Sequence, residues 1–256
     1  MANDLINWKT NSFILLRYIA AFQIVIGHCL FHFEFPADSI LQWIFRYFLK
    51  FIPGVPIFFG MSGFLMWASL SNNNNLFSYL KNRLKRIYPE LWGSVLVSIL
   101  SIIILYRKYD MKSLILFTLT QSSFLQFWTP QNLREFGCGT PNGSLWTIGI
   151  FIQFYITAYI LYRWIKPTLL YEHSHITFKF VLLGIISICC TIAYPRMTIF
   201  FDGGINSVYY KLIGQTIFPY LYMFLTGIII FEYKEYLLHN FQRFTLLYFT
   251  LLYFTL

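Results

Sequence analysis

The sequence predicts an all-α fold, a polytopic bundle of transmembrane helices, and three observations support this prediction. Hydrophobic residues make up 57% of the 256 positions, whereas charged residues make up only 11%. A soluble domain contains about 25% charged residues, so this chain cannot cover a water-facing surface. The apolar residues also gather in runs whose length, about 20 residues, suits a bilayer core. Soluble globular proteins, disordered chains and disulfide scaffolds are therefore excluded.

Six segments are predicted to span the membrane, and another apolar segment is shorter and interrupted. The predicted spans are Phe13–Phe33, Phe51–Leu70, Leu91–Tyr106, Leu145–Trp164, Ile176–Tyr194 and Val208–Phe231. Ser113–Phe127 is broken by Thr-Gln-Ser-Ser, so we expect it to be interfacial or re-entrant and not a crossing. If it crosses, the chain has seven spans. Glu34–Lys50 and Gln131–Ser144 are expected to be loops.

A cluster of cations sets the expected orientation of the bundle. Lys81-Asn-Arg-Leu-Lys-Arg86 contains four cations in six residues, and the positive-inside rule places such a loop in the cytoplasm. Two predicted spans precede it, so the N-terminus is expected to be cytoplasmic too. A purely topological role, with contacts to anionic headgroups, also explains the cluster. The net charge of +9 lies in short clusters between apolar runs, which does not suit nucleic-acid binding.

The first predicted span contains two polar residues, Arg17 and His28. Eleven residues make about three turns of an α-helix, so both side chains share one face, about 16 Å apart along the axis. Ionisable groups in a span are costly and usually face a protein interior or a water path. Snorkelling of Arg17 and simple packing of His28 are the alternatives. His32 lies one turn beyond His28, but no third ligand has suitable spacing, so no metal site is predicted.

Spacing also points to interior residues further along the chain. Trp146 and Gln153 are seven residues apart and therefore share a helix face, with Tyr155 close by. These three side chains could serve helix packing or contact the substrate, and the spacing fits both roles equally well. Ser62-Gly63 would allow another helix to approach closely. Ser62 has no adjacent base in the sequence, so we do not expect it to act as a nucleophile.

The chain ends in a repeat, FTLLY-FTLLY-FTL, over residues 244–256. No helix or strand has a period of five, but a tandem pentanucleotide TTTAC read in triplets encodes Phe-Thr-Leu-Leu-Tyr. Gain or loss of one unit changes the reading frame, so we hypothesise a phase-variable gene and a C-terminally incomplete chain. A chance apolar repeat is the alternative. These 13 residues are too few to span a bilayer by themselves.

Four strings, in order over residues 16–155, resemble the membrane proteins of acyltransferase family 3. They are Leu16-Arg-Tyr-Ile-Ala-Ala-Phe-Gln-Ile-Val-Ile-Gly-His28, Pro56-Ile-Phe-Phe-Gly-Met-Ser-Gly-Phe-Leu65, Lys81-Asn-Arg-Leu-Lys-Arg-Ile-Tyr-Pro89 followed by Trp92, and Gly143-Ser-Leu-Trp-Thr-Ile-Gly-Ile-Phe-Ile-Gln-Phe-Tyr155. The family core has about ten spans of bilayer length, so this chain would cover its first two thirds. One position departs from the pattern, because Phe151 stands where a Glu is usual.

The resemblance implies one acyltransferase domain over residues 1–256, a multi-pass O-acyltransferase of the bacterial inner membrane. It would move an acyl group, most often acetyl, from cytoplasmic acyl-CoA to a hydroxyl of a surface glycan or lipid-linked glycan, such as lipopolysaccharide O-antigen or capsule. His28 would act as the base, and Arg17, on the same helix face, would hold the donor or polarise groups along the path. Arg83 and Arg86 would hold phosphates of coenzyme A. Ser62, Trp146, Gln153 and Tyr155 would line the interior. No resident cofactor is expected, and the oligomeric state is left open.

Two other hypotheses remain. A transporter or flippase could use Arg17 and His28 as a polar path, although the sequence shows no inverted pair of broken spans. An inactive, truncated product would fit Phe151 and the terminal repeat. Transfer of a radiolabelled acetyl group would separate the first hypothesis from these two.

Overall fold

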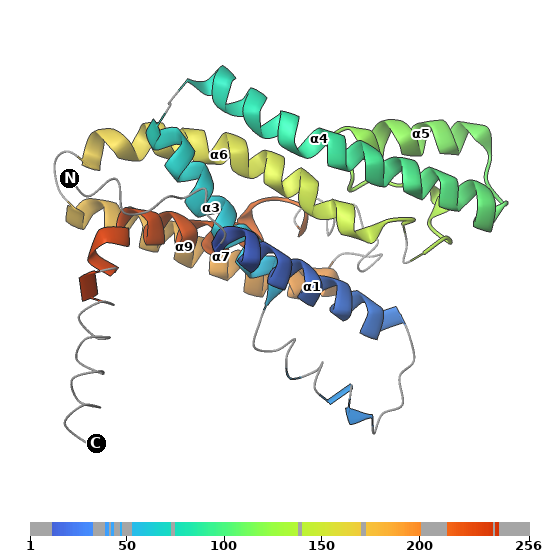
Figure 1. Cartoon of the computed structure of the whole chain (residues 1–256), viewed down its shortest axis with the longest axis horizontal. Coiled ribbons are helices and arrows are strands. Elements are labelled where there is room, and N and C mark those ends of the chain that lie inside the picture. Colours follow the sequence, from blue (N-terminus) through green and yellow to red (C-terminus); the bar gives the residue numbers. More distant parts are fainter. Residues whose placement is uncertain are drawn as a thin grey trace. The chain divides into compact units, whose positions relative to one another are not determined.

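Every regular element in the described part of the chain is a helix, as the sequence predicts (Figure 1). The computed structural model describes residues 12–32, 53–72, 75–137, 140–169, 173–200 and 214–237, with the separate residues 39, 40, 42, 43, 47, 239 and 240. In chain order the elements are α1 (Ser12–His32), α3 (Gly54–Asn72), α4 (Leu76–Ser101), η1 (Ile102–Tyr106), α5 (Met111–Ser122), η2 (Gln131–Leu133), η3 (Gly143–Leu145), α6 (Trp146–Leu169), α7 (His173–Phe200), η5 (Phe218–Tyr220) and α9 (Leu221–Glu232). The terminal repeat lies outside the described residues.

Four helices in these ranges are long and apolar enough to cross a membrane. They cover Phe13–Leu30, Gly54–Asn72, Leu76–Tyr106 and Gly143–Ile165. Two shorter apolar helices cover Lys179–Ala193 and Phe218–Glu232. The chain is thus a membrane protein, and the helices expected at residues 13–33, 51–70, 145–164 and 176–194 are all present.

The helices divide between two compact units, which are described separately. The first unit contains Met1–Leu65 and Met223–Leu256, and the second contains Met66–Tyr222. In the first unit the ring of Phe64 on α3 lies 5.2 Å from the ring of Phe13 on α1 and 5.2 Å from that of Phe231 on α9. One aromatic side chain of α3 therefore contacts both α1 and α9.

Glycines allow α3 and α9 to approach closely in the first unit. A methyl group on Gly63 would overlap the carbonyl oxygen of Phe224, and one on Gly227 would overlap the carbonyl oxygen of Gly60. The two backbones therefore touch with no side chain between them, as in membrane helix pairs built on small residues. The close helix approach predicted at Ser62-Gly63 is confirmed.

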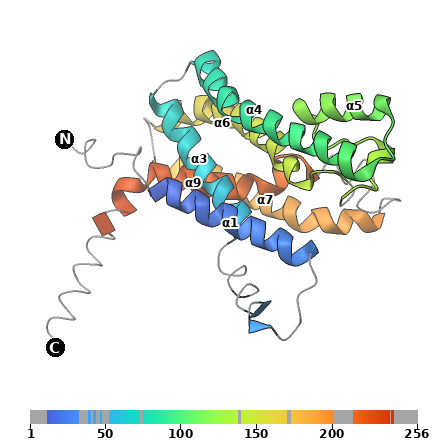
Figure 2. The same ribbon diagram turned by 45° about the vertical axis from the view of Figure 1, so that its right-hand side comes forward.

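In the second unit, α4 continues through the π-helical turn η1 and the chain then reverses into α5 (Figures 1 and 2). The two helices lie side by side. Nε1 of Trp92 donates a 3.3 Å hydrogen bond to the carbonyl oxygen of Ser122 at one end of the pair. At the other end, buried apolar side chains form a cluster of Ile102, Leu114, Phe117 and Leu133. The 12 residues of α5 span about 18 Å, so this helix is too short to cross, as expected for Ser113–Phe127.

The third spanning helix begins at Leu76 and not at the predicted Leu91. Oδ1 of Asn75 caps it by accepting a 3.0 Å hydrogen bond from the amide of Ser78. The cationic segment Lys81–Arg86, expected to be a loop, is therefore helical. Lys and Arg are good helix formers, so α4 includes these residues although they are too polar to belong to the apolar run that follows.

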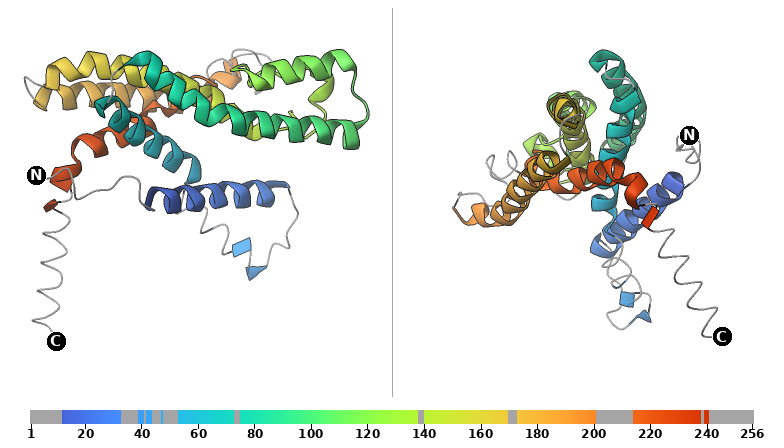
Figure 3. Two further views of the ribbon diagram at one scale, coloured as in Figure 1. Left: turned by 45° about the horizontal axis from the view of Figure 1, so that its top comes forward. Right: turned by 90° about the vertical axis from the view of Figure 1, so that its left-hand side faces the viewer.

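Helices α6 and α7 run along each other in the second unit (Figure 3). Trp67, in the second half of α3, packs against both helices. Its ring lies 5.1 Å from that of Tyr162 on α6 and 6.2 Å from that of Phe180 on α7. All three side chains are buried, so this aromatic group forms part of the unit's core.

The predicted span Val208–Phe231 is wrong as a continuous helix. In its described part, residues 215–217 form a turn, η5 adds one short 3₁₀ segment, and α9 begins only at Leu221. Pro219 lies at this break, where its fixed φ and missing N–H suit the start of a helix. Hydropathy does not reveal the break, because the residues after it are as apolar as a spanning helix.

Ser187 on α7 satisfies backbone groups on both sides of the break. Its Oγ donates a 2.6 Å hydrogen bond to the carbonyl oxygen of Phe218 and accepts a 2.9 Å hydrogen bond from the amide of Tyr222. Oγ1 of Thr191, one turn later on α7, donates to the carbonyl oxygen of Pro219. Irregular backbone in an apolar surrounding is stable only when the protein supplies such partners.

Replacing Gly227 by Ala should destabilise the protein by about 1–3 kcal/mol, because the new methyl group forces α3 and α9 apart. Gly93→Ala is the matched control, since a Cβ on Gly93 of α4 meets nothing within 4 Å. This control should match or exceed the stability of the wild type, by up to about 1 kcal/mol. Thermal unfolding of both variants in one detergent measures the difference, and equal melting temperatures would disprove the close contact.

The start of α5 should depend on pH through Asp110. Its Oδ2 accepts a 2.9 Å hydrogen bond from the amide of Ser113, and Nδ2 of Asn132 donates to its Oδ1. The hydrogen bond from Ser113 lowers the pKa of the Asp110 carboxyl from its ordinary 3.8. A lowered pKa in the folded chain means that this stabilisation is present above the ordinary pKa and is lost as pH falls through the folded value.

Hydrogen exchange of the first-turn amides of α5 measures this effect. Their protection, corrected for intrinsic exchange, should fall as pH decreases below the ordinary carboxyl pKa of 3.8. Asp110→Asn keeps a neutral cap and should remove the pH dependence. A persisting pH dependence in that variant would rule out Asp110 as its source.

Candidate functional site

Arg17 and His28 lie on α1, which is one uninterrupted helix. Eleven positions of continuous helix place both residues on one face, about 16 Å apart along the axis. In the first unit Arg17 is half-buried and His28 is exposed. A guanidinium can hold an anion and an imidazole can exchange a proton, so this helix face combines two functions that group transfer needs.

Ser62, on α3, belongs to the same unit. Its Oγ donates a 2.7 Å hydrogen bond to the carbonyl oxygen of Phe58, one turn earlier. This hydroxyl proton is thereby engaged by the backbone of its own helix. That Ser62 is not a nucleophile stays a prediction. Within the described ranges, no group of three or more His, Cys, Asp or Glu side chains could hold a metal ion.

Arg83 and Arg86 lie one turn apart on α4, in the second unit. Arg83 is half-buried, and its guanidinium carbon lies 5.6 Å from the centre of the Tyr79 ring, a cation–π distance. Arg86 is exposed, as is Lys81, whose ammonium lies 6.0 Å from the ring centre of Phe77. Two guanidiniums on successive turns of a helix suit an anionic, phosphate-like ligand.

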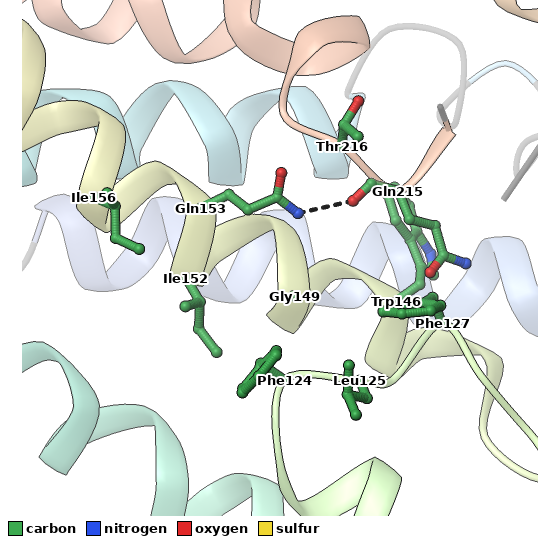
Figure 4. Close-up of a pocket in the computed structure, with 10 residues that line it drawn as sticks. All are labelled: Phe124, Leu125, Phe127, Trp146, Gly149, Ile152, Gln153, Ile156, Gln215 and Thr216. Atoms are coloured by element: carbon green, nitrogen blue, oxygen red, sulfur yellow. Dashed lines mark hydrogen bonds between the residues drawn. The ribbon is translucent and has the colours of Figure 1, made fainter. Parts of the chain in front are cut away.

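A cleft of about 420 Å³ opens in the second unit between α6, the segment after α5 and the turn before η5 (Figure 4). Most of its lining is apolar. The lining residues are Phe124, Leu125, Phe127, Trp146, Gly149, Ile152, Gln153, Ile156, Gln215 and Thr216. Trp146 and Gln153, which the sequence places on one helix face, both line this cleft.

Gln153 connects the α6 wall of the cleft to the break in the chain (Figure 4). Its Nε2 donates a 2.8 Å hydrogen bond to the carbonyl oxygen of Gln215, and its Oε1 accepts a 3.0 Å hydrogen bond from the amide of Ile217. One side-chain amide thus satisfies both an acceptor and a donor of the irregular backbone. The structural role of Gln153 is to hold the turn that carries Gln215 and Thr216.

Two buried glutamines hold the wall opposite α6. Nε2 of Gln121 donates a 3.0 Å hydrogen bond to the carbonyl oxygen of Trp128. Nε2 of Gln126 donates to the carbonyl oxygens of Gln121 and Ser123. The segment that presents Phe124 to the cleft is therefore fixed by side-chain hydrogen bonds and not by regular structure.

Tyr155 and Phe151 are not among the residues that line the cleft. Tyr155 is buried, and its ring packs edge-to-face on Tyr79 of α4 at 6.4 Å. Phe151 is half-buried, with its ring 6.2 Å from that of Phe154. The structure therefore separates Tyr155 from Trp146 and Gln153, although all three lie on α6.

Of the ten residues that line the cleft, only Trp146 and Gln153 were predicted from the sequence. The other eight are Phe124, Leu125, Phe127, Gly149, Ile152, Ile156, Gln215 and Thr216. The available signal was the polar pair Gln215-Thr216 shortly before Pro219, inside a segment expected to be a continuous span. Arg17, His28 and Ser62 belong to the first unit, whereas Arg83, Arg86, Trp146, Gln153 and Tyr155 belong to the second.

Comparison with known proteins gives two matches and one negative result. The family model described as an acyltransferase domain matches residues 10–256. Nodulation protein 10 of Rhizobium leguminosarum bv. viciae is 29% identical over 172 residues, which cover 62% of this chain and 46% of that protein. The chain thus spans about half the length of this curated relative. No solved structure matches.

Two variants of Gln153 should separate its two hydrogen bonds. Gln153→Leu leaves the Gln215 carbonyl and the Ile217 amide unpaired, which should cost about 1–3 kcal/mol for each group. Gln153→Glu keeps an acceptor for the Ile217 amide and loses only the donor to Gln215. Hydrogen exchange at Ile217 should therefore be fast in the Leu variant and slow in the Glu variant. Equal exchange in both would refute this assignment.

Proposed function

The chain belongs to acyltransferase family 3, and from this premise we propose that the protein transfers an acyl group from acyl-CoA to a hydroxyl of a cell-surface glycan or lipid-linked glycan. The match of the family model over residues 10–256 is the observation that supports the proposal most strongly. We propose acetyl as the acyl group and lipopolysaccharide O-antigen or capsule as the kind of glycan. The proposed location is the bacterial inner membrane with a cytoplasmic N-terminus, which the cation cluster on α4 favours.

In the proposed reaction, His28 acts as the general base. A neutral imidazole accepts the proton of the acceptor hydroxyl while the oxygen attacks the thioester carbonyl. A carbon–oxygen bond forms, the carbon–sulfur bond breaks, and the imidazolium returns the proton to the leaving thiolate. The position of His28 on the exposed side of α1 supports access of an acceptor to its ring.

The cationic side chains have separate roles in this proposal. Arg17 shares a helix face with His28 and would stabilise negative charge along that face. Arg83 and Arg86 would bind the phosphates of coenzyme A, because paired guanidiniums form charge-assisted hydrogen bonds with phosphate. The half-buried position of Arg83 over the Tyr79 ring supports a fixed geometry for one member of this pair.

Transport is the second candidate function, and one feature favours it. The break before α9 resembles the discontinuous helices that form substrate sites in transporters. Movement of a lipid-linked glycan between leaflets of vesicles, without acylation, would support transport and reject the acyltransferase proposal.

Purified protein mixed with radiolabelled acetyl-CoA and an acceptor glycan tests the proposal. His28→Ala should lower kcat by at least about 100-fold, because a general base contributes a factor of this order. His239→Ala is the matched control, since His239 is exposed and lies outside the proposed site. Absence of transfer by the wild type would reject the function, whereas unchanged transfer by His28→Ala would reject only the role of His28.

A further inference from the structure

We infer that the cleft of the second unit binds one hydrocarbon chain of a lipid. Resting on the proposed function, the inference extends to the acceptor, whose lipid anchor would occupy the cleft. Three separate observations support this inference: the residues that line the cleft, its length, and the hydrogen bonds that hold its walls.

The residues that line the cleft do not suit either coenzyme A or the glycan part of the acceptor. None of the ten lining residues is Lys, Arg, His, Asp or Glu, so the cleft offers no charged partner to the phosphates of coenzyme A. A glycan needs many hydrogen-bonding groups, but only three of the ten residues have amide or hydroxyl side chains. The amide of Gln153 is already bonded to Gln215 and Ile217. A hydrocarbon is the occupant that the remaining Phe, Leu, Ile and Trp side chains favour.

The length of the cleft fits one lipid chain. Its α6 wall extends from Trp146 to Ile156, eleven residues whose ten helical steps span about 15 Å. This is about half of the hydrocarbon thickness of a bilayer, and thus the depth of one leaflet. An acetyl group alone would leave most of this space empty. Ile156 and Phe124 are 49% and 61% exposed, so a chain can enter from the side of the bilayer.

The walls are held in place before any ligand binds. Gln153 holds the turn with Gln215 and Thr216, and Gln121 and Gln126 hold the segment with Phe124. Pre-formed walls lower the entropy that binding must offset, which distinguishes a specific site from an ordinary lipid-facing surface. The surface of η1, with exposed Ile103–Leu105, is such an ordinary surface in the same unit.

Photo-crosslinking tests the site without requiring activity. The full chain is reconstituted in phosphatidylglycerol vesicles that contain a trace of the same lipid with a diazirine on one acyl chain. After illumination, mass spectrometry should find more label on Phe124–Phe127 and Ile152–Ile156 than on Ile103–Leu105. Equal labelling would indicate surface lipid only, and absence of label from the cleft would indicate another occupant. Either result would overturn the inference.

Gly149→Leu should fill the cleft. A Cβ on Gly149 lies at an ordinary 3.4 Å from Oε1 of Gln126, so the first carbon fits while the rest of the side chain competes with the ligand. Cleft labelling should fall at least about fivefold. Gly184→Leu on α7 is the matched control, because its Cβ meets nothing within 4 Å, and it should label like the wild type. Ile156→Gln, a change at an exposed position, provides a second variant if Gly149→Leu does not fold.

Kinetics separates this inference from the proposed function. Gly149→Leu should raise the KM for a lipid-linked acceptor at least about fivefold relative to the KM for the same glycan without lipid. An unchanged ratio would reject the acceptor anchor as the occupant. If the wild type labels in the cleft but transfers to neither acceptor, the proposed function fails and the hydrocarbon site stands.

Discussion

The amide of Gln153 and the hydroxyl of Ser187 satisfy the backbone between Gln215 and Tyr222, where the chain interrupts its helix. A peptide group without a partner in an apolar surrounding costs several kcal/mol. These two side chains therefore stabilise a segment that is not helical. The break positions Gln215 and Thr216 at the cleft and makes α9 begin at Leu221. The wall of the cleft at Gln215 and Thr216 thus depends on side chains from α6 and α7, while Gln121 and Gln126 hold the opposite wall.

The polar groups proposed for chemistry lie on regular helices, whereas the cleft combines a helix with irregular segments. Arg17 and His28 are positioned by α1, and Arg83 and Arg86 by α4, so helical geometry alone sets the spacing within each pair. The cleft needs three segments that are far apart in sequence. Charged and titratable groups are thus arranged locally, while the apolar site requires long-range packing.

Several features followed from local pattern. Apolar runs located α1, α3, α6 and α7, and an interval of seven residues correctly placed Trp146 and Gln153 on one face. The start of α4 could not be predicted from the apolar run. Hydropathy indicates which part of a helix can contact lipid, but it does not indicate where helical hydrogen bonding begins. The break before α9 did not follow either, because Ser187 and Gln153 stabilise it from distant positions.

Composition and periodicity were sufficient to establish an all-α membrane protein, the shared face of Arg17 and His28, and the close approach of another helix at Ser62-Gly63. These properties depend on neighbours within a few turns, and a one-dimensional pattern records them. The break before α9 and the cleft depend on hydrogen bonds between residues 35 to 62 positions apart, such as Ser187 with Tyr222 and Gln153 with Gln215. Packing decided these features, because each partner is specified only once the helices have come together.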